Sequence, residues 1–196
     1  MDRNQGLRGP YQNRQETEGN MKAAFLRLLR EKDINDITIS DITRKAHVDR
    51  TTFYHHFLGI DDLVASLAKE MIWRTRNVIL QNGKSAITAF PHVVWWLATE
   101  LAETPCREII QSKYWSKMCE TIEESYLIFC SADKRLLKNP EMTSRIMAKA
   151  QFLLGGTLSS LAAMIGERFQ GEEEDLIATL MEEAMRLEQD VQKLCE

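Results

Sequence analysis

The residues of this chain that are best suited to recognition chemistry lie within one short stretch, 38–63. Helical spacing predicts that one group of them points outward, and each member can donate a hydrogen bond: Arg50, Thr51, Thr52, Tyr54 and His55. Donors of this kind meet phosphates and base edges when a helix enters the major groove of DNA. A surface helix with a solvated polar face has the same pattern. The spacing alone therefore leaves both interpretations open.

Two short helices and a tight turn are expected to position these donors. Thr38 is a suitable cap for the first helix, and Asp41 completes a capping box in which aspartate replaces the usual Glu or Gln. His47 falls where the chain must bend. Asp49 then caps a second helix over 50–56. Two helices joined by a turn of this length are typical of a helix-turn-helix motif.

The inner side of the second helix is apolar, because Phe53 and Phe57 lie one turn apart and share a face with Val48. The residues over 46–63, A-x-V-x-R-x-T-F-Y-x-H-F-x-x-x-x-x-L, resemble the amino-terminal signature of the TetR family of bacterial transcriptional regulators. The segment 21–31 looks like the first helix of that family, and 61–74 looks like its fourth. The resemblance implies that operator DNA is contacted, chiefly at its phosphates, by Thr38, Arg50, Thr51, Thr52, Tyr54, His55 and His56.

The sequence departs from the family pattern at two places. His47 stands at the turn position that is often glycine in the family, and histidine tolerates the left-handed conformation less well than glycine does. Ile60, followed by Asp61 and Asp62, stands where the family usually has a phosphate-binding lysine. One expected cation is therefore missing near the start of the fourth helix.

The charge of the chain is unevenly distributed. The net charge of the 196 residues is −4. Up to Asp62 there are ten Lys and Arg against ten Asp and Glu, and beyond it there are 15 against 19, so the acidity lies in the carboxy-terminal part. Binding to DNA should then depend on a few placed contacts and on dimerisation more than on bulk charge.

The composition, with 44% hydrophobic residues, is that of a globular protein. The segment 1–15 is polar and mildly basic, which predicts a flexible arm, with no secretory signal, and a cytoplasmic protein. The cysteines form no C-x-x-C pair, so we expect neither a disulfide framework nor a metal site, although a thiol-sensing role for one of them stays open: Cys106, Cys119, Cys130 and Cys195. No cofactor is predicted.

Hydrophobic periodicity predicts an all-α fold without strands. We expect three parts: the arm over 1–15, a three-helix helix-turn-helix DNA-binding domain over 16–60, and a larger helical effector-binding and dimerisation domain over 61–196. The predicted helices are 16–31, 38–46, 50–56, 61–80, 85–102, 107–131, 141–166 and 172–194. Pro91 should kink or split its helix, while Pro105 and Pro140 should mark helix boundaries.

The last two predicted helices carry long apolar stripes, and the first of the two is apolar around much of its circumference. In the TetR family the final two helices pair with those of a second copy, and these two helices look like that pair. The alternative is a central helix buried within a monomer. The expected dimer interface consists of Phe152, Gly156, Ser160, Ile177, Leu180, Met181, Ala184 and Leu187.

The middle helices are rich in aromatic residues, which predicts either a packed core or a pocket for a small hydrophobic or aromatic effector. The candidate pocket residues are Trp73, His92, Trp95, Trp96, Tyr114, Trp115, Tyr126, Phe129 and Phe152. The resemblance implies a repressor that binds a palindromic operator as a homodimer and is released by its effector. A second hypothesis is a TetR-like protein that no longer reads an operator and acts through protein partners. No motif supports an enzyme.

Overall fold

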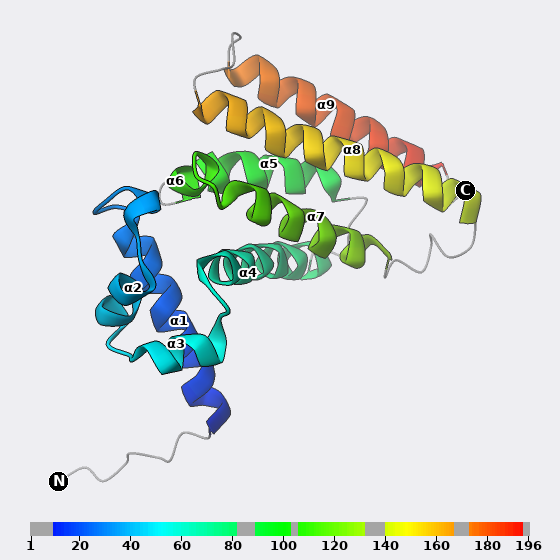
Figure 1. Cartoon of the computed structure of the whole chain (residues 1–196). Coiled ribbons are helices and arrows are strands. Elements are labelled where there is room, and N and C mark those ends of the chain that lie inside the picture. The colour runs from blue at the N-terminus through cyan, green and yellow to red at the C-terminus, as the bar shows by residue number, and fades with distance from the viewer. Residues whose placement is uncertain (1–9, 82–88, 103–105, 132–139, 167–172, 194–196) are drawn as a thin grey trace, which may run out of the picture. The chain divides into compact units, whose positions relative to one another are not determined.

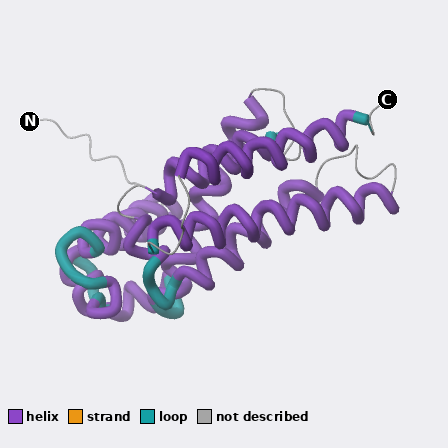
Figure 2. The backbone as a smooth tube through the Cα atoms, turned by 90° about the horizontal axis from the view of Figure 1, so that it is seen from above, coloured by secondary structure: helices purple, strands orange, loops and turns teal. Residues whose placement is uncertain are grey.

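The computed structural model describes residues 10–81, 89–102, 106–131, 140–166 and 173–193. Within these ranges the ordered elements are helices and no residue lies in a strand, so the predicted all-α class is confirmed (Figures 1 and 2). Contacts divide the chain into two compact units, Met1–Leu63 and Val64–Glu196. We call the first unit the head and the second the body. Among the described residues, no helix has both the length and the hydropathy that crossing a membrane requires.

The head contains α1 (Pro10–Leu28), the short 3-10 helix η1 (Ile34–Asp36), α2 (Ile39–Ala46), α3 (Arg50–His56) and the first residues of α4 (Ile60–Gln81). Helix α1 packs against α2, and α2 packs against α3. The core of the head is made by buried apolar side chains of these helices and of the segments between them: Met21, Ala24, Phe25, Leu28, Leu29, Ile34, Ile37, Ile42, Phe53, Phe57 and Leu63.

Helix α1 begins earlier than the sequence pattern predicts. Residues 10–15, assigned to a flexible arm, lie in this helix, which starts at Pro10. Proline suits the first helical position because its φ angle is already near the helical value and the N–H it lacks would have no partner there. The helix also ends before residue 31, since the N–H of Glu31 turns back to the carbonyl oxygen of Leu28 at 3.0 Å. Residues 1–9 of the predicted arm lie outside the described ranges.

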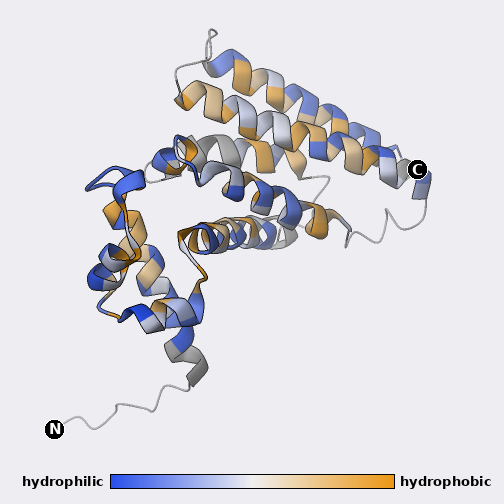
Figure 3. Cartoon of the chain, viewed as in Figure 1, coloured by the Kyte–Doolittle hydropathy of each residue, from blue (hydrophilic) through white to orange (hydrophobic). Residues whose placement is uncertain are grey.

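The body contains the rest of α4, followed by α5 (Phe90–Ala102), α6 (Cys106–Ile110), α7 (Trp115–Ser131), α8 (Pro140–Ile165) and α9 (Glu173–Gln192). Helix α8 is central, because α5, α7 and α9 all pack against it. In Figure 3 the hydrophobic residues of α9 lie on the side toward α8 and its hydrophilic residues lie on the opposite side. The core joins residues of all four helices, including Phe90, Val94, Ile122, Tyr126, Leu154, Leu158, Ala184 and Leu187.

Two predicted helices of the body differ from the structure. The helix expected over 85–102 is described only from Phe90, and Pro91 lies in the first turn of α5, where a missing N–H costs no backbone hydrogen bond. The helix expected over 107–131 is broken near Ser112. The Ser112 hydroxyl donates to the carbonyl oxygen of Ile109 at 2.8 Å and accepts from the N–H of Tyr114 at 3.1 Å. Such local bonds compete with helix continuation.

The proline expectations have different outcomes. Helix α8 begins at Pro140, so the predicted boundary there is confirmed. The boundary predicted at Pro105 falls on a residue outside the described ranges.

Candidate nucleic-acid interface

The capping box predicted at the start of α2 is present. The Thr38 hydroxyl accepts from the N–H of Asp41 at 3.2 Å, and the Asp41 carboxylate accepts from the N–H of Thr38 at 3.0 Å. Asp41 also binds two cations, Lys32 at 2.6 Å and Arg44 at 2.7 Å. The hydrogen bond from Lys32, followed by those from Thr38, holds the pKa of Asp41 well below its usual range. One carboxylate therefore ties α2 to the loop that precedes it.

Replacing Asp41 with asparagine is expected to make the free energy of unfolding less dependent on pH in the acid range. Because the pKa of Asp41 is lowered in the folded chain, its carboxylate contributes stability above its ordinary pKa of 3.8, and this contribution is lost as the pH falls below that value. Urea unfolding at about pH 6 and about pH 3 should show a difference between the two proteins that shrinks at the lower pH. The exposed Asp36 provides the control variant Asp36→Asn. A difference that stays constant with pH would contradict this account.

The turn between α2 and α3 is made at His47, as predicted. This residue has φ 55° and ψ 41°, in the left-handed region, and its N–H bonds back to the carbonyl oxygen of Arg44 at 3.3 Å. The N–H of Val48 bonds to the carbonyl oxygen of Thr43 at 3.0 Å, which closes the end of α2. Within the described ranges, no other residue apart from glycine has a positive φ. A non-glycine residue thus makes the turn that sets the angle between the two helices.

Helix α3 is fixed at its start and along its inner side. Asp49 accepts from the N–H of Thr52 at 2.6 Å, and this bond lowers the pKa of the Asp49 carboxyl group. Phe53 and Phe57 are both buried, with ring centroids 5.6 Å apart. The predicted cap, bounds and inner face of the helix are therefore present. A helix held in this way presents its other side in a defined orientation.

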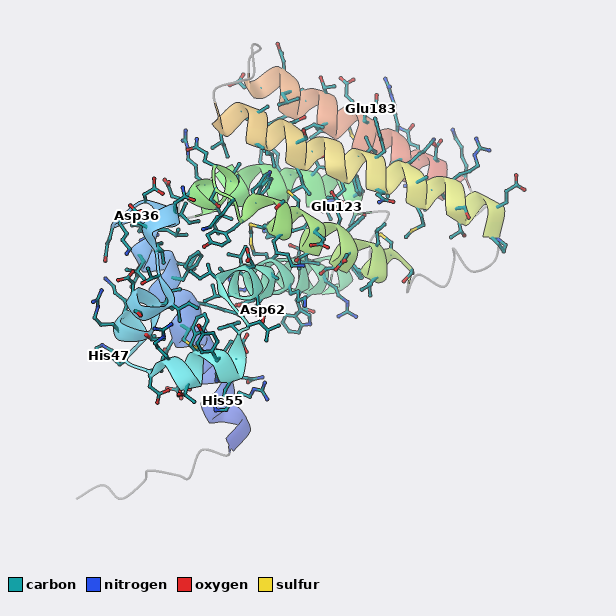
Figure 4. All side chains as sticks on the ribbon, viewed as in Figure 1. Asp36, His47, His55, Asp62, Glu123 and Glu183 are labelled. Atoms are coloured by element: carbon teal, nitrogen blue, oxygen red, sulfur yellow. The ribbon has the colours of Figure 1, made fainter. Side chains whose placement is uncertain are left out.

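The opposite side of α3 presents hydrogen-bond donors to solvent. Arg50, Thr51, Tyr54 and His55 are exposed, and Figure 4 shows His55 at the edge of the head. Tyr54 is 50% exposed, and its ring meets that of Phe53 edge-on at 5.7 Å. Across the described part of the chain, the side chains of Arg50, Thr51 and His55 have no hydrogen bond or ion pair. These donors are available to an external partner.

The other predicted contact residues differ in exposure. Thr38 is exposed at the start of α2, whereas Thr52 and His56 are half-buried. The Nδ1 atom of His56 is enclosed without a hydrogen-bond partner, and burial, followed by the nearby charge of Arg14, lowers the pKa of this histidine. His56 thus turns one nitrogen toward the interior, which the family pattern does not reveal.

One exposed cation in this region is absent from the predicted set. The Arg44 side chain is 79% exposed and is held by the Asp41 carboxylate. Arg44 follows Asp41 by three residues on the same helix, and this spacing predicts an ion pair that could have indicated Arg44 from the sequence. Arg44 adds a positive charge to the surface of α2 just before the turn.

Of the two acidic residues at the start of α4, Asp62 has a clear structural role. Asp62 accepts from the N–H of Leu58 at 3.0 Å and so closes the turn between α3 and α4. Asp61 is exposed, and Ile60 is half-buried. The carboxylate of Asp62 therefore caps this helix start, close to where the family usually places a cation.

The candidate effector residues do not surround one cavity. Trp73, His92, Trp95 and Phe152 are exposed, while Tyr114 and Tyr126 are buried in the core, where Tyr126 packs on Phe90 with centroids 5.5 Å apart. Trp96, Trp115 and Phe129 are half-buried. Two neighbouring hollows lie between α7 and α8, and of the nine candidates only Trp115 and Phe152 line them. The nine candidates therefore differ in exposure and do not line one hollow together, and the effector pocket stays a prediction.

The predicted dimer residues are also divided. Phe152 and Gly156 are exposed, and Ser160, Ile177, Leu180 and Met181 are half-buried. Ala184 and Leu187 are buried within the single chain. These last two belong to the packing between α9 and its own chain, which removes them from the surface available to a second copy.

Comparison with known proteins identifies the amino-terminal segment. The family described as bacterial regulatory proteins, tetR family, matches residues 22–67. Over 48 residues the chain is 46% identical to an uncharacterised HTH-type transcriptional regulator, YxbF, of Bacillus subtilis strain 168. This match covers 24% of the chain and 13% of the length of that relative. It concerns the DNA-binding segment and not the whole protein.

Two solved structures are similar over most of the chain. A TetR transcriptional regulator from Rhodococcus sp. RHA1 has a TM-score of 0.64 and 14% identity, with 89% of this chain and 97% of that chain covered. The dihydroxyacetone kinase operon activator DhaS has a TM-score of 0.53 and 18% identity, with 88% and 96% covered. At these identities the likeness shows the fold. The family that matches residues 22–67 is one of regulators. Residues 22–67 of this chain therefore match the tetR family of bacterial regulatory proteins, and the fold over most of the chain is that of a TetR structure.

Proposed function

We propose that this protein is a transcriptional regulator that acts in the cytoplasm and binds operator DNA through the exposed side of α3 and the start of α2. The observation that supports this most directly is the row of donors on α3, Arg50, Thr51, Tyr54 and His55, which is exposed while Phe53 and Phe57 hold the helix from inside. A helix oriented in this way can enter a major groove, with Arg50 and Thr38 at phosphates.

The proposal includes a homodimer that uses the surface of α8 and α9. Two reading helices about 34 Å apart fit successive major grooves on one face of a palindromic operator. The exposed Phe152 and Gly156 on α8, with the half-buried Leu180 and Met181 on α9, support this surface. Dimerisation matters here because the head has as many acidic as basic residues up to Asp62. A single head therefore lacks the net positive charge that would attract it strongly to DNA phosphates.

We propose further that a small molecule with an apolar or aromatic body controls the binding of DNA, and that the protein represses transcription until this effector binds. The family resemblance supports repression, while a structurally similar protein is titled an operon activator, so the sign of regulation needs its own measurement. Deleting the gene should raise transcription from the operator if the protein represses it. Lower transcription after deletion would identify an activator.

The first test is binding of the purified protein to DNA fragments that flank its own gene, compared with shuffled fragments of the same composition. We expect tight binding to one flanking fragment that weakens steeply between about 50 and 200 mM salt, because bound phosphates release counterions. Equal and weak binding to every fragment by a protein that still dimerises would overturn operator reading.

A protein partner is the second candidate, and one local feature favours it. Leu58, two residues after the end of α3, is 88% exposed, and the exposed carboxylate of Asp61 lies three residues further along. An apolar side chain beside an acidic one is poorly suited to a phosphate backbone and better suited to a protein surface. This candidate predicts an intact dimer that binds no DNA fragment selectively.

Replacing Ile60 with lysine is expected to strengthen DNA binding severalfold, because it restores the cation that the family usually has at this position. Each added phosphate contact should steepen the logarithmic salt dependence by about 0.9. Fluorescence anisotropy with the operator fragment across a salt series measures both quantities. The control is Ile128→Lys, which places the same charge at an exposed position of α7. Weaker binding by Ile60→Lys than by the control would show that the half-buried Ile60 has a packing role instead.

A further inference from the structure

The body has an open hollow between α7 and α8 that no part of the DNA-binding proposal uses. Its volume is about 390 Å³, within the range of small-molecule sites. Helix α7 contributes Trp115, Cys119 and Glu123, spaced four residues apart on one side of the helix. Helix α8 contributes mostly small residues, which leave the space open: Gly155, Leu158, Ser159, Ala162 and Ala163.

Glu123 is the polar group around which the hollow is built. Figure 4 labels it on α7, beside α8. The side chain is half-buried, and it makes no hydrogen bond or ion pair with any residue that the structure describes. It also lines a second hollow of about 570 Å³, which extends along the same helices toward Phe152. A carboxylate at the junction of two hollows, without a partner among the described residues, is suited to bind a cation.

Cys119 lies one turn before Glu123 on α7, and its pKa is affected by the charge of Glu123. Burial, followed by the negative charge of Glu123, raises the pKa of the Cys119 thiol to about 12. Cys119 therefore stays a neutral, weakly polar lining residue and is not a thiolate that could react or bind a metal. Among the described residues, no group of three His, Cys, Asp or Glu side chains is placed to hold a metal ion. The hollow therefore offers one carboxylate and the hydroxyl of Ser159 among mostly apolar groups.

Trp115 supplies the second element of recognition. It is half-buried two turns before Glu123, at the other end of the lining stripe of α7. An indole ring attracts cations to its face and packs against flat apolar groups. On the facing helix, a Cβ atom at Gly155 would lie 3.6 Å from a carboxylate oxygen of Glu123, so a longer side chain at that position would cover the carboxylate. Glycine keeps this approach open.

We propose that the hollow between α7 and α8 binds an organic cation with a flat apolar body, whose charged nitrogen lies at Glu123 and whose apolar part packs on Trp115 and the small residues of α8. That this cation is the effector rests on the proposed regulatory function. That the hollow binds such a cation can be tested without DNA. The site excludes anions, because Glu123 is the only charged side chain in the described lining of either hollow.

The test compares two probes of nearly equal shape, 2-phenylethylammonium and the neutral 2-phenylethanol, with the full-length protein. Binding is followed by ligand-observed NMR, which suits weak complexes. A hydrogen-bonded ion pair in a partly buried site should favour the ammonium over the alcohol by about tenfold. In Glu123→Gln the preference should disappear, and the affinity for the alcohol should change little. Trp115→Leu should weaken binding of both probes.

The matched control is Glu124→Gln, which removes the next carboxylate on α7 from an exposed position outside the hollow. It should retain the preference for the ammonium. Circular dichroism and thermal unfolding of each variant separate loss of the site from loss of the fold. Equal binding of the two probes by the unmodified protein would overturn the proposal, and so would equal loss of preference in Glu123→Gln and Glu124→Gln. Because no DNA is present, failure here leaves the test of operator binding unaffected.

Discussion

Replacing Arg50 with alanine is expected to weaken binding of the operator by at least about tenfold while the helical content and the oligomeric state stay unchanged. Arg50 is exposed at the start of α3, and its guanidinium group has no partner within the described structure. A hydrogen bond to a charged group contributes roughly 1.5–3 kcal/mol, and a two-fold complex loses the contact twice. The salt dependence should also become shallower, by about 0.9 for each phosphate contact removed.

The control for Arg50→Ala is Arg30→Ala, which removes another exposed cation of the head from a position outside α2 and α3. Tyr54 allows a second comparison. Tyr54→Phe keeps the ring against Phe53 and removes only the hydroxyl, whereas Tyr54→Ala also removes the packing. Weak binding by both Tyr54 variants would assign the hydroxyl to DNA contact. A change in affinity as large in Arg30→Ala as in Arg50→Ala would show that the head acts only through its total charge.

The elements of the head could be predicted from the sequence because their determinants are local. The capping box of Thr38 and Asp41, the cap at Asp49 and the inner pair Phe53 and Phe57 each depend on residues three or four positions apart. The turn was predicted at His47 because the chain must bend there before Val48 returns to the interior. The family resemblance added which outward residues to consider. What it did not reveal is the enclosed nitrogen of His56, since that depends on how the neighbouring helix packs.

The body was harder to predict because its features depend on contacts between distant helices. The break at Ser112 results from a hydroxyl that bonds to the local backbone, a choice that periodicity cannot register. The aromatic residues share a chemical type, yet Tyr126 is buried against Phe90 while Trp73 is 60% exposed. Which face of a helix becomes core is decided by its neighbours. In the sequence Glu123 is one acidic residue among many, and only its position between α7 and α8 distinguishes it.

Phe152 is 79% exposed on α8 in the single chain. If the surface of α8 and α9 forms the dimer, Phe152→Glu should raise the dissociation constant of the dimer by more than about a hundredfold, because apolar area is lost and two unpaired carboxylates would be buried. The monomer should fold normally, since this side chain contributes little to the core of its own chain. Analytical ultracentrifugation over a range of protein concentrations measures the change directly.

Ile128→Glu is the matched control, because Ile128 is also a large apolar residue, 70% exposed, but lies on α7 outside the predicted interface. It should leave the dimer intact. Operator binding should depend on the dimer, because the second head of a dimer binds at a high effective concentration. Loss of the dimer should therefore weaken the affinity for the operator by roughly 10²–10⁴-fold. Phe152→Glu should therefore lose operator binding although every residue of α3 is unchanged. A Phe152→Glu protein that remained dimeric would place the interface elsewhere, and a monomer that still bound the operator tightly would mean that a single head suffices.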